Sequence, residues 1–313
     1  MPIPVIMDCD PGHDDAIALV LAYACPEIEI LAVTTSAGNQ TIDKTTLNAR
    51  KVLSFLGCGA PVARGASKPL FRELIIAPQV HGESGLDGPA LPEPTSPESP
   101  MSAVELAAKT IRECDRGVTI VATAALTNVA ALLLAHPELK SKIERISLMG
   151  GSAVGGNWTP AAEFNILVDP EAAQIVFNAG IPVTMCGLDV THQALVTRAD
   201  TERFRVIGGR CSTMVAELLD FFVKFHEANF DFGGSPLHDP CAVAWLVDPG
   251  IFVSRKAHVD VECRGRHTTG ATVVDFGGVS GGAMNVDVVT GLDLGRFIDL
   301  LDSALRRLDR GMA

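Results

Sequence analysis

The chain has 313 residues, of which 47% are hydrophobic, so a large buried core can form. Twenty-five basic residues stand against 37 acidic ones, which gives a formal net charge of −12. This balance argues against a nucleic-acid partner, because a nucleic-acid backbone needs a basic face. A neutral small molecule is compatible with it, above all one that is held through a bound cation.

The first residues lack the marks of a secretory signal, since they have no basic region and Asp8 interrupts the first apolar run. No stretch reaches the roughly 18 apolar residues that a membrane-spanning helix needs. The eight cysteines are scattered without a Cys-x-x-Cys pair, which favours buried reduced thiols over disulfides or a zinc site. We therefore expect a cytoplasmic protein that contacts no membrane.

Short apolar runs alternate with helical patterns through the first 190 residues. The predicted strands cover residues 5–7, 28–35, 61–63, 118–122, 145–149 and 181–186. Helices are predicted between them, at 16–22, 41–56, 102–114, 127–135 and from 169 onward. This alternation predicts an α/β fold with an open, mostly parallel sheet that carries helices on both faces.

The remaining stretches are less regular. Residues 68–100 are rich in Pro, Gly, Glu and Ser, and a loop of that length inside a compact domain is often functional. Residues 197–247 are predicted to be mainly helical. Short strands at 259–263, 271–276 and 283–289 predict a small C-terminal β-hairpin addition at an edge of the sheet, and 293–308 predicts a closing amphipathic helix. Without a repeat or a linker, residues 1–313 are expected to form a single domain.

Four aspartates follow the first predicted strand within eight residues. They are Asp8, Asp10, Asp14 and Asp15. Pro11 and Gly12 predict a turn among them, and the apolar run that follows predicts a buried helix. The acids thus stand at the C-terminal end of a strand and the N-terminus of a helix, where α/β sheets bind ligands.

Carboxylates this close repel one another unless something positive lies between them. A helix N-terminus supplies only about half a charge, whereas a hard divalent cation with oxygen ligands, Ca²⁺ or Mg²⁺, would do more. The alternative is structural, with Asp14 or Asp15 as a helix cap and Asp10 as a turn residue. The cluster as a whole favours a metal site.

Polar residues recur after later strands. Asn39 follows the second strand, and the stretch 156–165 follows the fifth, with Asn157, Glu163 and Asn165 able to hydrogen-bond adjacent sugar hydroxyls. A polar surface loop is the alternative for that stretch.

The sequence Leu237-His238-Asp239-Pro240 reads either as a capped helix start or, beside an acidic cluster, as a metal ligand preceded by a histidine acid. A phenylalanine-rich helix at 213–232 is mostly core in character, but His226 and Phe230 near its end could wall a pocket for a flat ring.

Taken together, these motifs resemble the nucleoside hydrolase family, the inosine-uridine-preferring N-ribohydrolases. The resemblance is carried by Asp-Pro-Gly-x-Asp-Asp near the N-terminus, Leu-Thr-Asn at 126–128, Gly-Asn-x-Thr-Pro-x-x-Glu-Phe-Asn at 156–165 and His-Asp-Pro at 238–240. Stretches 157–165 and 188–192 look most like the bacterial pyrimidine-preferring members. The resemblance implies a bound Ca²⁺, hydrolysis of the N-glycosidic bond of ribonucleosides to free base and ribose, with uridine and cytidine as expected substrates, and a dimer or tetramer.

The resemblance also assigns roles to individual residues. As Ca²⁺ ligands it implies Asp10, Asp15, Asp239 and the backbone carbonyl of Thr123. As ribose-binding residues it implies Asp14, Asn39, Asn157, Glu163 and Asn165. Near the base it implies His81, His226, Phe230 and His238. Thr123-Ala124-Ala125 departs from the glycine-containing turn expected there, but only a carbonyl is needed.

Breaking a bond between C1′ and nitrogen builds positive charge on the ribose ring. Asp10, beside a metal-held water, is expected to take the proton of that water, and His238, or else His81, to assist the departing base.

Other functions remain open at this point. Purine or broad specificity, and a non-catalytic Ca²⁺-dependent nucleoside or ribose binder, are the nearest alternatives. A haloacid-dehalogenase phosphatase would need Thr or Ser where Gly12 stands, and a Rossmann dinucleotide enzyme would need a Gly-x-Gly-x-x-Gly after the first strand.

Overall fold

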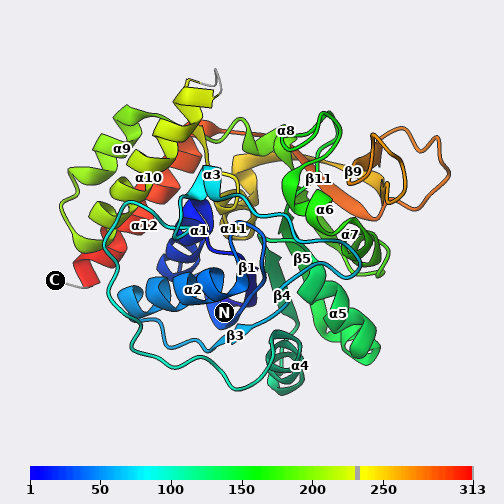
Figure 1. The fold of residues 1–313 in the computed structure, drawn as a ribbon, viewed down its shortest axis with the longest axis horizontal. Helices are drawn as coiled ribbons and strands as arrows, with labels where there is room; N and C mark the ends of the chain where they lie inside the picture. The colour runs from blue at the N-terminus through cyan, green and yellow to red at the C-terminus, as the bar shows by residue number, and fades with distance from the viewer. Residues whose placement is uncertain (230–232, 312–313) are drawn as a thin grey trace.

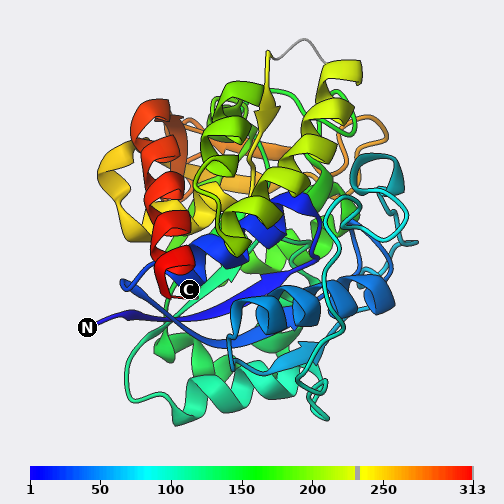
Figure 2. The same cartoon turned by 90° about the vertical axis from the view of Figure 1, so that its left-hand side faces the viewer.

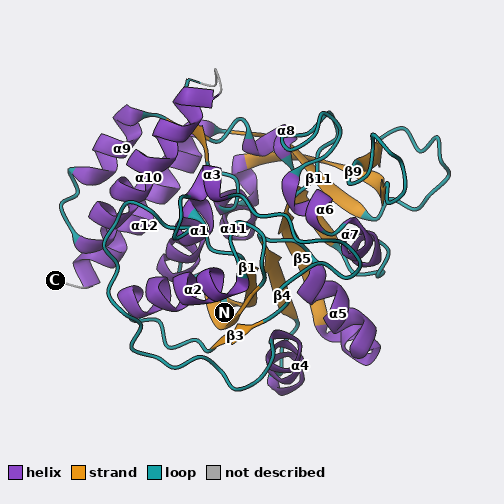
Figure 3. Cartoon of the chain, in the orientation of Figure 1, coloured by secondary structure: helices purple, strands orange, loops and turns teal. Residues whose placement is uncertain are grey.

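The computed structural model describes residues 1–229 and 233–311. The described residues form a nine-stranded sheet with the order β10-β9-β11-β6-β5-β4-β1-β2-β3. Figures 1 and 3 show this sheet running through the centre of the molecule between helices. The strands are β1 (Ile3–Cys9), β2 (Ile28–Thr35), β3 (Val62–Arg64), β4 (Val118–Ala122), β5 (Ile143–Met149), β6 (Val183–Cys186), β9 (Phe252–Val261), β10 (Thr272–Asp275) and β11 (Val286–Leu292). Every neighbouring pair from β11 through β6, β5, β4, β1 and β2 to β3 is parallel, which confirms the predicted fold class.

Helices cover both faces of this sheet. They are α1 (His13–Ala24), α2 (Ile42–Leu56), α3 (Pro78–His81), α4 (Ala103–Glu113), α5 (Thr127–Ala135), α6 (Phe164–Val168), α7 (Pro170–Phe177), α8 (Leu188–Thr191), α9 (Arg198–Arg205), α10 (Arg210–Asn229), α11 (Pro240–Val247) and α12 (Leu294–Gly311). One buried cluster joins the sheet to α1, α2, α10, α11 and α12, and a second joins its other face to α4, α5 and α7. In Figure 2, α12 lies against α1 on the first of these faces.

Strand β1 is the point from which the chain winds in both directions. It pairs with β2 on one side and β4 on the other, both in parallel. Its residues from Pro4 to Cys9 are buried or nearly so, as expected of a strand that is covered on both faces. In such sheets the crevice for a ligand opens at the carboxyl ends of the strands beside this switch point. Asp10 directly follows β1.

The C-terminal strands belong to the main sheet, and one of them, β9, is longer than predicted. β11 pairs in parallel with β6 and antiparallel with β9, and β10 pairs with the outer side of β9. Strand β9 begins at Phe252 rather than at residue 259. The charged pair Arg255 and Lys256 interrupts the apolar alternation there, so the sequence pattern concealed the start of the strand.

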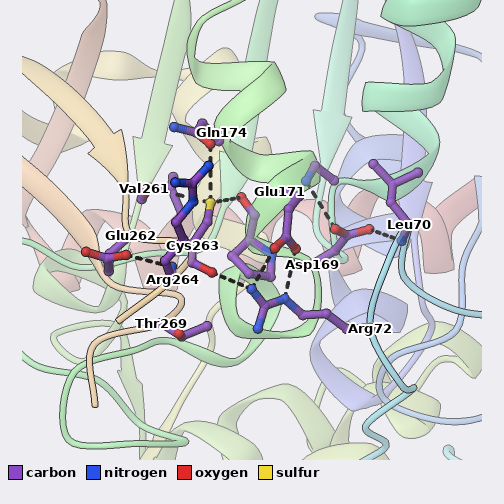
Figure 4. A network of polar contacts seen from close by, with 12 residues as sticks. Leu70, Arg72, Asp169, Glu171, Gln174, Val261, Glu262, Cys263, Arg264 and Thr269 are labelled. Carbon is purple, nitrogen blue, oxygen red and sulfur yellow. Dashed lines mark hydrogen bonds and ion pairs between the residues drawn. The ribbon is translucent and has the colours of Figure 1, made fainter. Parts of the chain in front are cut away.

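The long loop expected at 68–100 is present, and α3 is a single helical turn within it. Its first part is fixed to distant segments, as Figure 4 shows. Arg72 makes a bidentate ion pair with Glu171 of α7 and also donates to the carbonyl of Cys263. Asp169, fully buried, accepts from the backbone N–H of Leu70. The loop is therefore tied to both α7 and the turn after β9 before it reaches α3.

Among the described residues, no helix combines the length and the apolar character needed to cross a bilayer. None of the eight cysteines forms a disulfide in the described structure, and five of them are buried.

Candidate active site

The first element of the site is the turn between β1 and α1. Pro11 and Gly12 end the strand, and the Asp15 carboxylate accepts from the backbone N–H of Gly12 at 3.1 Å, which closes the first turn of α1. Asp14 and Asp15 thereby point from the helix N-terminus, where negative charge is favoured. Asp10 and Asp15 are both completely buried.

The end of β2 meets this turn through Asn39. Its backbone N–H donates to Oδ2 of Asp10 at 2.7 Å, and its side-chain amide donates to Oδ2 of Asp15 at 2.9 Å. Asn39 therefore connects two of the predicted metal ligands, as well as lining the cavity described below. Gly38 makes this approach possible, because a Cβ at that position would lie 2.1 Å from Oδ2 of Asp10.

Asp239 reaches the same place from the start of α11. Carboxylate oxygens of Asp14, Asp15 and Asp239, all buried, lie within 4.8 Å of one another. The hydroxyl of Thr123, just beyond β4, donates to Oδ1 of Asp15 at 2.7 Å. The structure thus brings the predicted ligands Asp15, Asp239 and Thr123 together. It adds Asp14 to the cluster, whereas Asp10 stands beside the cluster and is held by Asn39.

Burial and mutual repulsion disfavour the charged forms of these carboxyls. Burial, and then the charge of Asp15, raise the pKa of Asp14 to about 8. Burial raises the pKa of Asp10 and of Asp239 well above the usual range, and the neighbouring aspartates add to both shifts. A divalent cation among these oxygens would remove that repulsion. The hard oxygen donors fit Ca²⁺ or Mg²⁺, which both prefer such ligands.

The segment after β5 supplies the next group. Glu163 is buried and caps α6, since its carboxylate accepts from the backbone N–H groups of Gly151, Asn165 and Ile166. Burial raises its pKa to about 7. The Asn165 amide donates to the carbonyl of Thr123 at 3.0 Å, so this segment adjoins the acidic cluster directly. Asn157 accepts from the backbone N–H of Phe164, which holds its loop against α6.

Histidines and aromatic rings form the other side of the site. His81, at the end of α3, lies with its Nδ1 3.3 Å from Nδ1 of His13, and the His13 ring stacks on Phe221 at a centroid distance of 4.8 Å. His226 of α10 has its Nδ1 2.9 Å from both the carbonyl of Phe222 and the hydroxyl of Ser235. Burial lowers the pKa of His81 and of His226, which favours the neutral form of both rings.

His238 directly precedes Asp239. Its Nδ1 lies 2.8 Å from the hydroxyl of Thr191 in α8, and its ring meets that of His192 edge-on at 5.7 Å. Burial lowers the pKa of His238 as well. Phe230, predicted near the base, lies outside the described residues.

All these groups surround one cavity of about 480 Å³. Ten of the predicted site residues line it: Asp14, Asn39, His81, Thr123, Asn157, Glu163, Asn165, His226, His238 and Asp239. The sequence interpretation did not assign Trp158, His192, Phe222 or Phe225, which also line it. Trp158 and His192 fall inside the two motif stretches, so their position was a usable signal. Phe222 and Phe225 were treated as core, because helical periodicity alone does not distinguish a core face from a pocket wall.

The sequence model of a family described as inosine-uridine preferring nucleoside hydrolase matches residues 5–299. The chain belongs to this family. It is 58% identical over 308 residues to proteins named pyrimidine-specific ribonucleoside hydrolase RihA from Salmonella schwarzengrund and Escherichia coli K12, covering 98% of this chain and 99% of each relative. Membership confirms the predicted enzyme class, a nucleoside N-ribohydrolase.

Solved structures give the same fold. A purine-preferring ribonucleoside hydrolase from Gardnerella vaginalis superposes with a TM-score of 0.93 at 32% identity, over 99% of this chain and 100% of that one. An inosine-uridine preferring nucleoside hydrolase from Bacillus anthracis gives a TM-score of 0.83 over 97% and 99% of the two chains. At 19% identity, that second match supports the fold alone.

Proposed function

We propose that this chain hydrolyses the N-glycosidic bond of pyrimidine ribonucleosides, uridine and cytidine, to free base and ribose in a Ca²⁺-dependent reaction. The observation that carries the proposal is the arrangement of one cavity. Buried aspartates form one part of its wall, together with Glu163 and Asn165, which can hydrogen-bond a sugar. Histidines form another part. The preference for pyrimidines rests on the 58% identical relatives, which are named pyrimidine-specific.

The proposed Ca²⁺ ligands are Asp10, Asp15, Asp239 and the carbonyl of Thr123, with Asp14 within reach of the same ion. When bound, the cation supplies positive charge that holds the ribose hydroxyls and makes a coordinated water more acidic. The carbonyl of Thr123 already accepts from Asn165, and its second lone pair is available.

Asp10 is the proposed general base. Its carboxylate is the proposed acceptor of a proton from the attacking water. Asn39 fixes its carboxylate through two donated hydrogen bonds. As the glycosidic bond breaks, the ribose ring gains positive charge, and the surrounding carboxylates stabilise that charge.

The ribose hydroxyls are the proposed partners of five side chains: Asp14, Asn39, Asn157, Glu163 and Asn165. Glu163 and Asn165 are fixed by α6, so they meet the sugar without further ordering. At the other side of the cavity His238 is the proposed donor to the departing base, with His81 second. His226, and Phe230 by its place in the sequence, are proposed to surround the base.

The direct test is ribose release from uridine, cytidine, inosine, adenosine and 2′-deoxyuridine, without phosphate, with and without exhaustive chelation. Release from uridine and cytidine that chelation abolishes and Ca²⁺ restores supports the proposal. If Mg²⁺ restores activity equally well, the metal assignment is wrong and the reaction stands.

Purine hydrolysis is the second candidate. It is favoured by the Gardnerella vaginalis structure, which is purine-preferring and superposes over 99% of this chain. Inosine turnover comparable with that of uridine would support it.

We also propose a cytoplasmic location and a homodimer or homotetramer. Five buried cysteines that form no disulfide in the described structure fit a reducing compartment. Sedimentation equilibrium of the purified chain tests the assembly, and a monomer over the working concentration range would refute it.

A further inference from the structure

Within the described part of the chain, the side-chain hydroxyl of Thr191 has one hydrogen-bond partner, and that partner is the proposed leaving-group donor, His238. The residue ends the one-turn helix α8 and is fully buried. Its hydroxyl oxygen lies 2.8 Å from Nδ1 of His238. Among the described residues, no other side chain or carbonyl is a hydrogen-bond partner of this hydroxyl.

This contact determines which nitrogen of His238 carries the proton. A buried hydroxyl has one hydrogen, and leaving that hydrogen without an acceptor costs about 1–3 kcal/mol. Nδ1 of His238 is the acceptor on offer, so Thr191 donates to it. With its lone pair at Nδ1 engaged by this hydroxyl, the imidazole carries its one N–H at Nε2.

Nε2 opens on the cavity. His238 lines the cavity, and its Nε2 makes no hydrogen bond to a described residue. The fully enclosed side-chain atoms that lack a partner are, among the described residues, Asp8 Oδ2 and Ser36 Oγ, so Nε2 is not closed off. In the Nε2–H tautomer, His238 presents a hydrogen-bond donor to a ligand in the cavity. In the Nδ1–H tautomer, it would present a lone pair instead.

The fold holds the two residues in register. Strands β7 (Leu195–Val196) and β8 (Ser235–Pro236) pair antiparallel, and the backbone N–H of Leu237 donates to the carbonyl of Ala194 at 2.9 Å. This short ladder connects the segment after Thr191 with the segment before His238. Helix α8 is in turn fixed on Gly151, whose carbonyl accepts from the backbone N–H of Leu188 at 2.9 Å.

We propose that Thr191 is a positioning residue that holds His238 in its Nε2–H tautomer, so that His238 donates a hydrogen bond to the departing base. The inference rests on the proposed function, since it concerns the leaving group of that reaction. Thr191 itself does not touch the substrate.

The test compares Thr191→Val, which keeps shape and removes the hydroxyl, with Thr191→Ser, which keeps it. Two substrates are used with the Ca²⁺-loaded enzyme: uridine, whose base needs a donor, and 4-nitrophenyl β-ribofuranoside, whose phenolate leaves without one. Thr191→Val is expected to lower kcat for uridine by about 10- to 100-fold, while kcat for the nitrophenyl riboside changes less than about twofold. Thr191→Ser is expected to restore uridine turnover.

The matched control is Thr201→Val, which removes another buried threonine hydroxyl, in α9, where it bonds the carbonyl of Thr197. It is expected to leave both substrates unaffected. Equal losses on both substrates with Thr191→Val, or no loss on either, would overturn the inference.

A measurement that does not depend on activity separates this inference from the proposed function. The ¹⁵N chemical shifts of the His238 ring report which nitrogen carries the proton. We expect the His238 ring to be protonated at Nε2 in the unmodified chain and to be a mixture of both tautomers in Thr191→Val. Protonated Nδ1 in the unmodified chain would overturn it. Failure of the unmodified enzyme to hydrolyse any nucleoside would instead count against the proposed function.

Discussion

The backbone N–H of Asn39 donates to Oδ2 of Asp10 at 2.7 Å, which joins the ends of the neighbouring strands β2 and β1. Because β1 and β2 are neighbours in the sheet, the segments that follow them lie close enough to form this contact in the site. Asp10 is oriented by the strand beside it, and the same asparagine reaches Asp15 through its side chain. The proposed base is therefore held in place before any ligand is bound.

Asp10→Asn is expected to leave the fold intact and to lower kcat by about 10²- to 10⁴-fold, because an amide cannot accept the proton of water. Ribose release and circular dichroism measure the two effects. Asp115→Asn, a change at an exposed aspartate after α4, is the control and should behave like the unmodified chain. Near-normal turnover with Asp10→Asn would exclude this residue as the base.

Gly38→Ala is expected to lower activity without touching a reacting group. The new Cβ would lie 2.1 Å from Oδ2 of Asp10, so the carboxylate or the β2 turn must move. A misplacement of about 1 Å costs on the order of 100-fold in rate. Gly59→Ala is the matched control, since a Cβ there meets nothing within 4 Å. Equal kcat/KM for the two variants would show that the approach of Gly38 to Asp10 has no importance.

Chelation is expected to destabilise the protein more at pH 8 than at pH 5. Folding raises the pKa of Asp14 to about 8 and those of Asp10 and Asp239 also upward, above the value of about 4 in an unfolded chain. Between these pH values the metal-free folded state binds more protons than the unfolded state. Its free energy of unfolding therefore falls as the pH rises through that window.

Thermal melts at pH 5, 7 and 8, each with chelator and with saturating Ca²⁺, measure this effect. The difference in Tm between the two conditions should grow with pH, because the ion replaces the protons that the carboxyls lose. A Tm that chelation leaves unchanged at pH 8 would argue against a metal among these aspartates.

Glu163→Gln is expected to cost about 1–3 kcal/mol of stability. Both carboxylate oxygens of Glu163 accept backbone N–H groups, from Gly151 and Ile166 on one side and Asn165 on the other. A glutamine amide turns an NH₂ group toward at least one of these donors, whichever way it is oriented. Urea unfolding measures the loss, with Glu113→Gln at an exposed position as control. An unchanged midpoint would mean that the cap of α6 is not needed.

The part of the site that could be predicted from the sequence is the part built on strand ends. Asp10, Asn39, Thr123 and Glu163 each follow a strand of the parallel sheet, so the alternation of strands and helices was enough to place them together. The C-terminal edge was predicted less well. Arg255 and Lys256 in β9 are both exposed, and their charges concealed the strand in the sequence pattern.

The histidine side of the cavity could not be derived in this way. Its position depends on how α10 packs and on the β7–β8 ladder, which brings His238 to Thr191 across 47 residues of sequence. The stack of His13 with Phe221 is likewise a product of tertiary packing. The proximity of Asp14 to Asp239 could not be derived either, because Asp239 reaches the cluster from the start of α11.

Ca²⁺-dependent hydrolysis of uridine is tested most directly by the rate of ribose release from uridine. We would measure this rate with the purified chain before chelation, after exhaustive chelation and after addition of Ca²⁺. We expect fast release, near-complete loss on chelation and recovery with Ca²⁺. Release that survives exhaustive chelation unchanged, or no release from any ribonucleoside by the folded and Ca²⁺-loaded protein, would contradict this expectation.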